Sequence, residues 1–241
     1  MSNKINRSPG HNIKGKNIGG WKFNDDEVVN AFQEHIQVSI PSYDQAHNVI
    51  TKVSDCFITD GDKCIEIGCS LGELITKLAK RHSEKKVDFF AFDSSSHMIN
   101  KAISNNTDNR IIFEVINALE YKYDANFVVS AFTIQFIQPK VRQNLINKIY
   151  SEMEWGGGFC LFEKVRGSDA RFQDILTSIH WEWKMENGLS DEEIISKWRS
   201  LKRVMEPFSE RGNLDMLKRA GFQDIETIWK WGPFQGFLAI K

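Results

Sequence analysis

Lys63-Cys64-Ile65-Glu66-Ile67-Gly68-Cys69-Ser70-Leu71-Gly72 runs from an apolar strand into a glycine turn, and a helix is expected to follow from Glu73. Twenty-one residues after Gly72, a second apolar strand ends at Asp93. In α/β folds, a tight turn at the end of one strand and a carboxylate at the end of the next hold a nucleoside and its ribose diol. The spacing favours S-adenosylmethionine over a dinucleotide.

Each candidate cofactor contact has a chemical reason. The backbone at Gly68 and Gly72 is expected to approach the methionine part, because glycine has no side chain to block it. Asp93 is expected to accept hydrogen bonds from the ribose hydroxyls, and Ser94 to lie beside the adenine. Asn117, followed by Ala118, ends the third strand, where a polar group suits the adenine amine. Ala131 and Phe132 end the fourth strand and should form the floor near the reactive carbon.

The same glycine turn also spells G-x-S-x-G, the nucleophile elbow of α/β-hydrolases. Ser70 would then be the nucleophile, and His180, the only histidine after His97, would be the base. Three observations weigh against this alternative. The segment is the first confident strand, Glu66 suits an adenosylmethionine motif, and a hydrolase leaves Asp93 unexplained.

Strands and helices alternate along the chain. Strands are expected at 63–67, 87–92, 111–116, 126–132, 159–165, 225–231 and 235–240, and helices at 24–37, 43–57, 72–82, 96–104 and 141–154. Alternation predicts an α/β fold with a parallel, doubly wound, Rossmann-like sheet. The last two strands flank Gly232 and Pro233, which favour a hairpin turn. A C-terminal antiparallel hairpin on such a sheet is the class I methyltransferase variant.

The chain is predicted to form one domain over 21–241, preceded by a flexible arm over 1–20. Residues 21–60 are expected to be a helical lid. Residues 169–206, which contain Trp181, Trp183 and Trp198, break the alternation and predict a helical insertion over the ligand site. This insertion is a candidate dimer interface.

Composition excludes several function classes. The chain has 241 residues and a net charge of −1, so nothing global indicates nucleic acid. No apolar run approaches the roughly 20 residues of a membrane helix, and the polar start is no secretory signal. The four scattered cysteines have no metal-ligand spacing. We therefore expect a cytoplasmic protein that binds a small-molecule substrate and no metal.

Candidates for proton transfer are few. Glu163, followed by Lys164, ends the fifth strand, and His180 lies in the insertion. Tyr43 is a weaker candidate. A structural ion pair between Glu163 and Lys164, and a packed role for His180, are the alternatives for these residues.

At this point the chain resembles a known family, the carboxy-S-adenosylmethionine synthases. The resemblance rests on blocks along the chain from Trp21 onwards. The blocks are Gly20-Trp21-Lys22-Phe23, Ile36-Gln37-Val38-Ser39-Ile40-Pro41-Ser42-Tyr43, Gly68-Cys69-Ser70-Leu71-Gly72, Phe132-Thr133-Ile134-Gln135-Phe136, Lys148-Ile149-Tyr150, Glu163-Lys164, His180, Asn187-Gly188-Leu189-Ser190, Val204-Met205 and Ala220-Gly221-Phe222.

The resemblance implies a dimeric protein with a methyltransferase fold. It implies that S-adenosylmethionine and prephenate become a carboxylated sulfonium, with release of phenylpyruvate. By position it makes cofactor contacts of Tyr43, Gly68, Cys69, Ser70, Asp93 and Ser94, and of Asn117 and Ala118 after a one-residue shift.

Two departures from the family matter. Ala131 stands where the family has asparagine. Trp198 stands where the family has an arginine that pairs with the added carboxylate, with Arg199 one residue later as a possible substitute. One residue on a helix is a rotation of about 100°. We therefore expect a small-molecule methyltransferase first, with S-adenosylmethionine or S-adenosylhomocysteine bound. Carboxy-S-adenosylmethionine synthesis, intramolecular cyclisation of the sulfonium, and a non-catalytic binding protein remain as alternatives.

Overall fold

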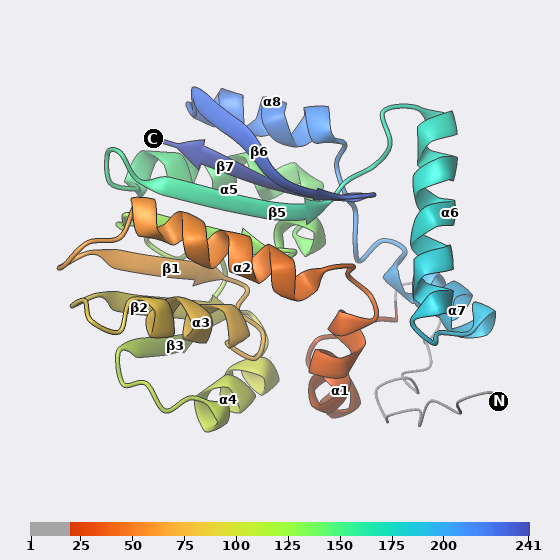
Figure 1. The fold of residues 1–241 in the computed structure, drawn as a ribbon, viewed down its shortest axis with the longest axis horizontal. Coiled ribbons are helices and arrows are strands. Elements are labelled where there is room, and N and C mark those ends of the chain that lie inside the picture. Colours follow the sequence, from red (N-terminus) through yellow and green to blue (C-terminus); the bar gives the residue numbers. More distant parts are fainter. Residues whose placement is uncertain (1–19) are drawn as a thin grey trace.

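The computed structural model describes residues 20–241 and contains one seven-stranded sheet (Figure 1). Its strands, in sequence order, are β1 (Lys63–Ile67), β2 (Asp88–Asp93), β3 (Ile111–Val115), β4 (Phe127–Ala131), β5 (Gly158–Lys164), β6 (Asp224–Trp231) and β7 (Phe234–Ile240). The spatial order is β3-β2-β1-β4-β5-β7-β6. The first five are parallel, and β7 is antiparallel to both β5 and β6. The predicted fold class is confirmed.

Strand order reverses between β1 and β4, and ligands of open parallel sheets bind outside the carboxyl ends of the strands at such a switch point. The first two helices are α1 (Asp26–Gln37) and α2 (Tyr43–Val53). The helices α3 (Glu73–Arg81), α4 (Ser96–Asn105) and α5 (Pro139–Glu152) connect parallel strands. The helices α6 (Ala170–Glu186), α7 (Asp191–Leu201) and α8 (Glu210–Ala220) lie between β5 and β6.

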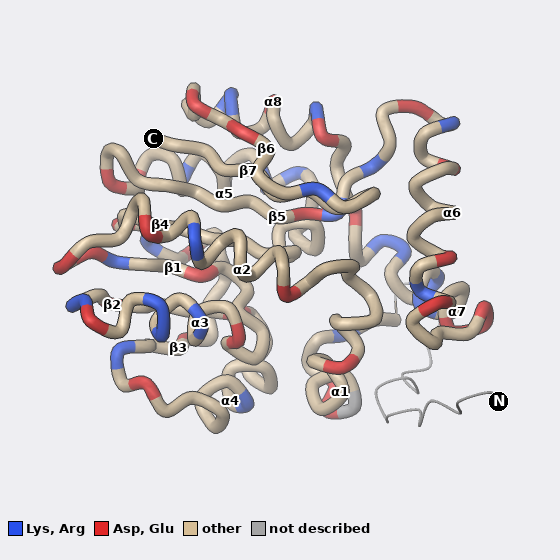
Figure 2. The backbone as a smooth tube through the Cα atoms, viewed as in Figure 1, with Lys and Arg blue, Asp and Glu red and all other residues tan. Residues whose placement is uncertain are grey.

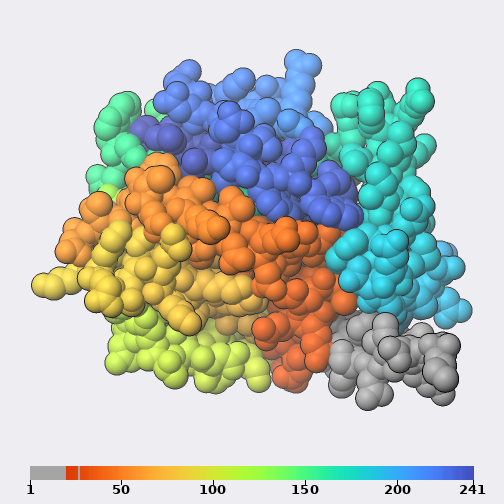
Figure 3. All heavy atoms as spheres, viewed as in Figure 1, coloured from red at the N-terminus to blue at the C-terminus, as the bar shows by residue number. Residues whose placement is uncertain are grey.

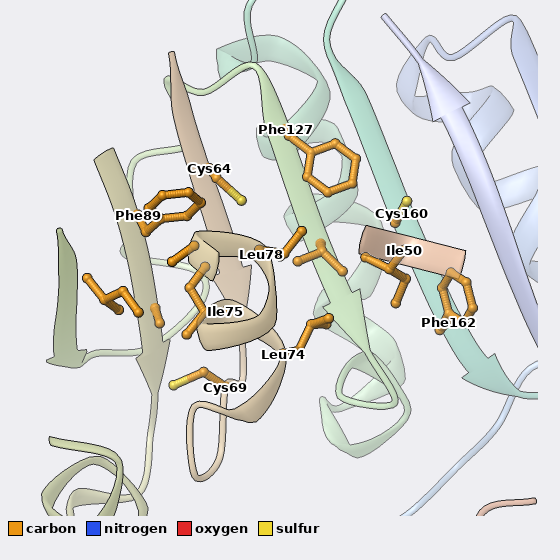
Figure 4. Packing of buried hydrophobic residues seen from close by; sticks show 14 of the residues in the cluster. Ile50, Cys64, Cys69, Leu74, Ile75, Leu78, Phe89, Phe127, Cys160 and Phe162 are labelled. Atoms are coloured by element: carbon orange, nitrogen blue, oxygen red, sulfur yellow. The ribbon is translucent and has the colours of Figure 1, made fainter. Parts of the chain in front are cut away.

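Two apolar cores cover the two faces of the sheet. On one face, Cys64, Phe89 and Phe127 of the strands pack with Ile50 of α2 and Leu78 of α3 (Figure 4). On the other face, strand residues such as Ile65, Val128 and Phe237 pack with α5 and α8. Because neighbouring strand residues point to opposite faces, continuously apolar strands supply both cores.

The insertion stands beside the sheet, on the side toward which the parallel strands point (Figure 1). Helix α6 projects from the body in the space-filling view (Figure 3), and His180 is its only buried residue. Ser190 caps α7 with a capping box to Glu193. A third apolar cluster joins Trp21, Val28 and Phe32 to Met98 of α4, which fixes α1 near the same edge of the sheet.

Some expected boundaries differ from the structure. The helix expected over 43–57 ends at Val53 and is followed by a short 3-10 helix, Ser54–Cys56, where the Phe57 N–H donates to the Ser54 carbonyl three residues earlier. Helix α8 was not expected; Ser209 caps it and Gly221 ends it with φ 125°. The arm expected over 1–20 falls, apart from residue 20, outside the described residues.

Candidate active site

The glycine turn after β1 is held in a conformation that requires glycine. Gly68 has φ +68°, and a Cβ there would lie 2.2 Å from Thr133 Cγ2. The N–H groups of Gly68 and Cys69 both donate to the carbonyl of Phe92, which ties the turn to the end of β2. Gly72 begins α3 with φ +75° and packs against the Phe113 ring. Backbone rather than side chains therefore lines this part of the site.

Asp93 closes the other side of this turn. Its Oδ2 accepts the Ser70 N–H at 3.1 Å and its Oδ1 accepts the Ser95 N–H at 2.9 Å. Burial raises the pKa of the carboxyl, while these backbone N–H groups lower it. Each carboxylate oxygen can accept more than one hydrogen bond, so both remain available to a ribose diol. Asp93 thus supports the turn as well as facing the cavity.

Glu66 lies beneath the turn. Its Oε2 accepts the Ile75 N–H at 2.9 Å in the first turn of α3. Burial raises the pKa of Glu66 to about 8. The side chain therefore joins β1 to α3 and lines the cavity beside the predicted methionine position.

One large cavity, with a volume of about 980 Å³, lies along the carboxyl ends of the strands. All ten predicted cofactor residues line it: Tyr43, Gly68, Cys69, Ser70, Gly72, Asp93, Ser94, Asn117, Ala118 and Ala131. The volume is at the upper end of the range for small-molecule sites and leaves room for a second ligand. We call the part lined by Gly68, Asp93 and Asn117 the cofactor end.

The far part of the cavity, which we call the lysine end, is formed by Lys164 at the end of β5, His180 and Lys184 of α6, and Lys197 of α7. Desolvation lowers the pKa of Lys164 to about 8 and that of Lys184 to about 7, with Lys164 lowering Lys184 further. The pKa of Lys197 is also lowered by burial and then by Lys184. Lys184 is therefore close enough to Lys164 and to Lys197 for the charges of each pair to repel.

His180 is held by both ring nitrogens. Its Nε2 lies 3.0 Å from the Ser39 carbonyl oxygen, so this nitrogen carries the proton, and its Nδ1 accepts from Lys164 Nζ at 3.4 Å. Burial, together with the charges of Lys164 and Lys184, holds its pKa far below the usual range. This geometry supports the packed role for His180, which orients Lys164, rather than the expected base.

Glu163 lies away from the cavity lining. Neighbouring residues on β5 point to opposite faces, so Lys164 faces the cavity while Glu163 points into the core beside Arg142. Burial raises the pKa of Glu163 to about 8, and its Oε1 has no hydrogen-bond partner among the described residues. The expected base role of Glu163, and its ion pair with Lys164, do not fit this placement.

Arg199 and Trp198 also lie outside the cavity lining of their own chain. Trp198 is 48% exposed, and Arg199 is exposed one residue further along α7. The residue of this turn that lines the cavity is Lys197, whose ammonium lies over the Trp21 ring. In this turn of α7 it is therefore Lys197, and neither Trp198 nor the possible substitute Arg199, that presents a cation to the cavity.

The hydrolase alternative is not supported by the geometry. Ser70 has φ 49° within the glycine turn, and its N–H donates to Asp93. Both nitrogens of His180, the histidine that this alternative requires as its base, are occupied by Ser39 and Lys164.

Comparisons with known proteins agree with the fold. A methyltransferase domain family matches residues 64–157. A carboxy-S-adenosyl-L-methionine synthase from Staphylococcus epidermidis is 32% identical over 92% of this chain and 97% of the relative. The chain belongs to the carboxy-S-adenosyl-L-methionine synthase family. A second relative in it, from Nautilia profundicola, is 32% identical over 90% of this chain and 93% of its own.

Solved structures show the same fold at low identity. Human N-acetylserotonin methyltransferase in complex with S-adenosylmethionine has a TM-score of 0.62 and 15% identity, over 90% of this chain and 55% of that chain. A Haemonchus contortus phosphoethanolamine N-methyltransferase in complex with S-adenosylhomocysteine has a TM-score of 0.65 and 16% identity, over 92% and 61%. The chain is an S-adenosylmethionine-dependent enzyme of the class I methyltransferase fold.

Within residues 20–241, no group of three or more histidine, cysteine or carboxylate side chains is arranged to hold a metal ion. No helix in the described part of the chain is long and apolar enough to cross a membrane.

Proposed function

We propose that this enzyme makes carboxy-S-adenosylmethionine from S-adenosylmethionine and prephenate. One observation carries the proposal. The generic methyltransferase match ends at residue 157, whereas the relatedness to a carboxy-S-adenosyl-L-methionine synthase extends over 92% of the chain. It therefore includes the segments that enclose the lysine end, namely the region of Trp21 and helices α6 and α7.

The residues of the cofactor end fit S-adenosylmethionine. The backbone at Gly68 leaves no room for a side chain, Asp93 presents a carboxylate to a ribose, and Tyr43, whose ring lies 6.1 Å from that of Phe132, covers the floor. When bound, the sulfonium supplies the methyl carbon that is modified. We propose that residues 21–60 act as the lid over this site, within one domain over 21–241.

The proposed reaction balances without a metal or an oxidant. One carbon–carbon bond of prephenate breaks, and its carboxyl group forms a new bond to the methyl carbon. The methyl proton and the ring hydroxyl leave together as water, and phenylpyruvate is released. The chain's own part is to align two ligands in one enclosed cavity and to exclude bulk water.

Mass spectrometry of the small molecule released from the purified, denatured protein tests this function. Carboxy-S-adenosylmethionine, which is heavier than S-adenosylmethionine by one carbon dioxide, is the expected ligand. Release of S-adenosylhomocysteine alone would instead support the methyltransferase alternative, which Trp198 at the family's arginine position favours.

We further propose that the protein is a cytoplasmic homodimer. Free cysteines at 56, 64, 69 and 160 fit a reducing compartment. Helix α6 exposes Phe172, Ile175 and Ile179 at 53%, 44% and 43%, and their spacing puts them on one face. On α7, Ile195 and Trp198 are 39% and 48% exposed. An apolar face of this kind on a projecting helix supports association between chains.

Changing Ile179 to aspartate is expected to convert this dimer to a monomer, because a charge would be buried in an apolar contact. Light scattering after gel filtration measures the mass. Ile103→Asp on α4, where Ile103 is 53% exposed, is the matched control and should remain dimeric. A wild-type protein that is monomeric at micromolar concentration would contradict the proposal.

A further inference from the structure

Charge is divided between the two ends of the cavity. The carboxylates that line it, Glu66, Glu73 and Asp93, all belong to β1, α3 and β2 at the cofactor end. Lysine and arginine positions occur where α6 meets α7, beside the acidic first turn of α7 (Figure 2). S-adenosylmethionine has a net positive charge, because its amino and carboxylate groups cancel and the sulfonium remains. An acidic end therefore suits this ligand, and a basic end does not.

The lysines of the two ends differ in their partners. Lys77 lies near Glu73 and bonds both Glu73 at 2.7 Å and Asp44 at 3.0 Å, so its charge is neutralised within the protein. No ion pair between described residues involves Lys164, Lys184 or Lys197. Lys164 instead contacts His180 and the Phe234 ring, and Lys197 contacts the Trp21 ring.

Burying a cation without an ion-pair partner is unfavourable. We therefore expect a ligand to supply the negative charge that these half-buried lysines lack. The cofactor's single carboxylate does not supply it, since its own ammonium group offsets it. Three lysines lie here, on three different elements, which is more positive charge than one added carboxylate would neutralise. The aromatic rings of Phe132 and Phe234 also line the cavity, which suits a ligand that carries a ring between its two carboxylates.

We propose that Lys164, Lys184 and Lys197 form the binding site for a cyclic dicarboxylate, and that Lys197 performs on α7 the role that the resemblance gives to an arginine. The inference rests on the proposed function and names the residues that select its second substrate. The lowered pKa values of the three lysines agree, because burial lowers each of them and no described carboxylate offsets that effect.

Calorimetric titration of prephenate into the full-length protein loaded with S-adenosylhomocysteine tests this site, because that ligand has no methyl group to react. Lys184→Met and Lys197→Met are each expected to weaken prephenate binding by about 10- to 100-fold, the loss of one charge-assisted contact. Lys184→Arg and Lys197→Arg should retain most of the affinity. Removing a desolvated ammonium should not impair folding, and thermal unfolding checks this.

Lys218→Met on α8 is the matched control, because Lys218 is exposed and outside the cavity; it should leave prephenate affinity unchanged. Affinity for S-adenosylhomocysteine should stay within about twofold of the wild-type value in every variant, a smaller change than the loss of one hydrogen bond would cause. Unchanged prephenate binding in both methionine variants, or an equal loss of S-adenosylhomocysteine binding, would overturn the site.

Phthalate, another cyclic dicarboxylate, is titrated in parallel to separate the binding site from the proposed function. If it binds in a lysine-dependent manner while prephenate does not, the dicarboxylate site stands and the proposed function fails; binding of neither overturns the site.

Discussion

Replacing Asp93 with alanine is expected to weaken S-adenosylmethionine binding by about 1–3 kcal/mol through lost ribose hydrogen bonds, a factor of about 5 to 150. We expect the loss of binding free energy to lie toward the upper end of this range. The same carboxylate accepts the N–H groups of Ser70 and Ser95, so its removal also releases the turn that approaches the ligand. Isothermal titration with S-adenosylhomocysteine measures the change directly.

Asp88→Ala is the matched control for this variant. Asp88 begins the same strand that Asp93 ends, and it is exposed and far from the cavity lining. Its removal should leave the dissociation constant unchanged. If Asp93→Ala binds the ligand as tightly as Asp88→Ala does, the ribose assignment is wrong.

Gly68→Ala is expected to destabilise the protein by about 2–5 kcal/mol, which combines left-handed backbone strain with overpacking. The new Cβ would lie 2.2 Å from Thr133 Cγ2 and 2.5 Å from Thr133 Oγ1. Thr133 cannot simply turn away, because its Cβ would lie only 2.9 Å from the new atom. Urea unfolding, followed by circular dichroism, measures the loss.

Gly61→Ala separates strain from overpacking. Gly61 has φ +88°, but a Cβ there would meet nothing within 4 Å. Its variant should therefore lose only the strain, about 1–2 kcal/mol. Equal losses at the two positions would show that Thr133 does not restrict the turn, and that the close approach has no energetic weight.

The cofactor end was predictable from sequence because local patterns determine it. A strand followed by Gly68 and Gly72 places backbone at the sheet edge, and the end of the next strand puts Asp93 beside it. These positions depend on the order of strands, which alternation already predicts. By contrast, α8 was not predicted, although Ser209 is of a residue type that caps helices and Gly221 of the type that ends them.

The lysine end was not predictable in the same way. Whether Lys197, Trp198 or Arg199 faces the cavity depends on the rotation of α7, which tertiary packing sets through the buried Ile194 and Ser200. Spacing offered one usable signal, because Lys197 follows the buried Ile194 by three residues and therefore shares its face. Lys184 follows His180 by four residues on α6 in the same way. On β5, side chains alternate between the two faces of the strand, so Lys164 lines the cavity and the neighbouring Glu163, which we expected there, does not.

The most direct test of the account is turnover of S-adenosylmethionine with prephenate that carries ¹³C in its ring carboxyl group, read by mass spectrometry. The account predicts a labelled carboxy-S-adenosylmethionine, formed together with phenylpyruvate and absent when prephenate is omitted. Formation of S-adenosylhomocysteine or of methylthioadenosine, with no label in the sulfonium product, would contradict it.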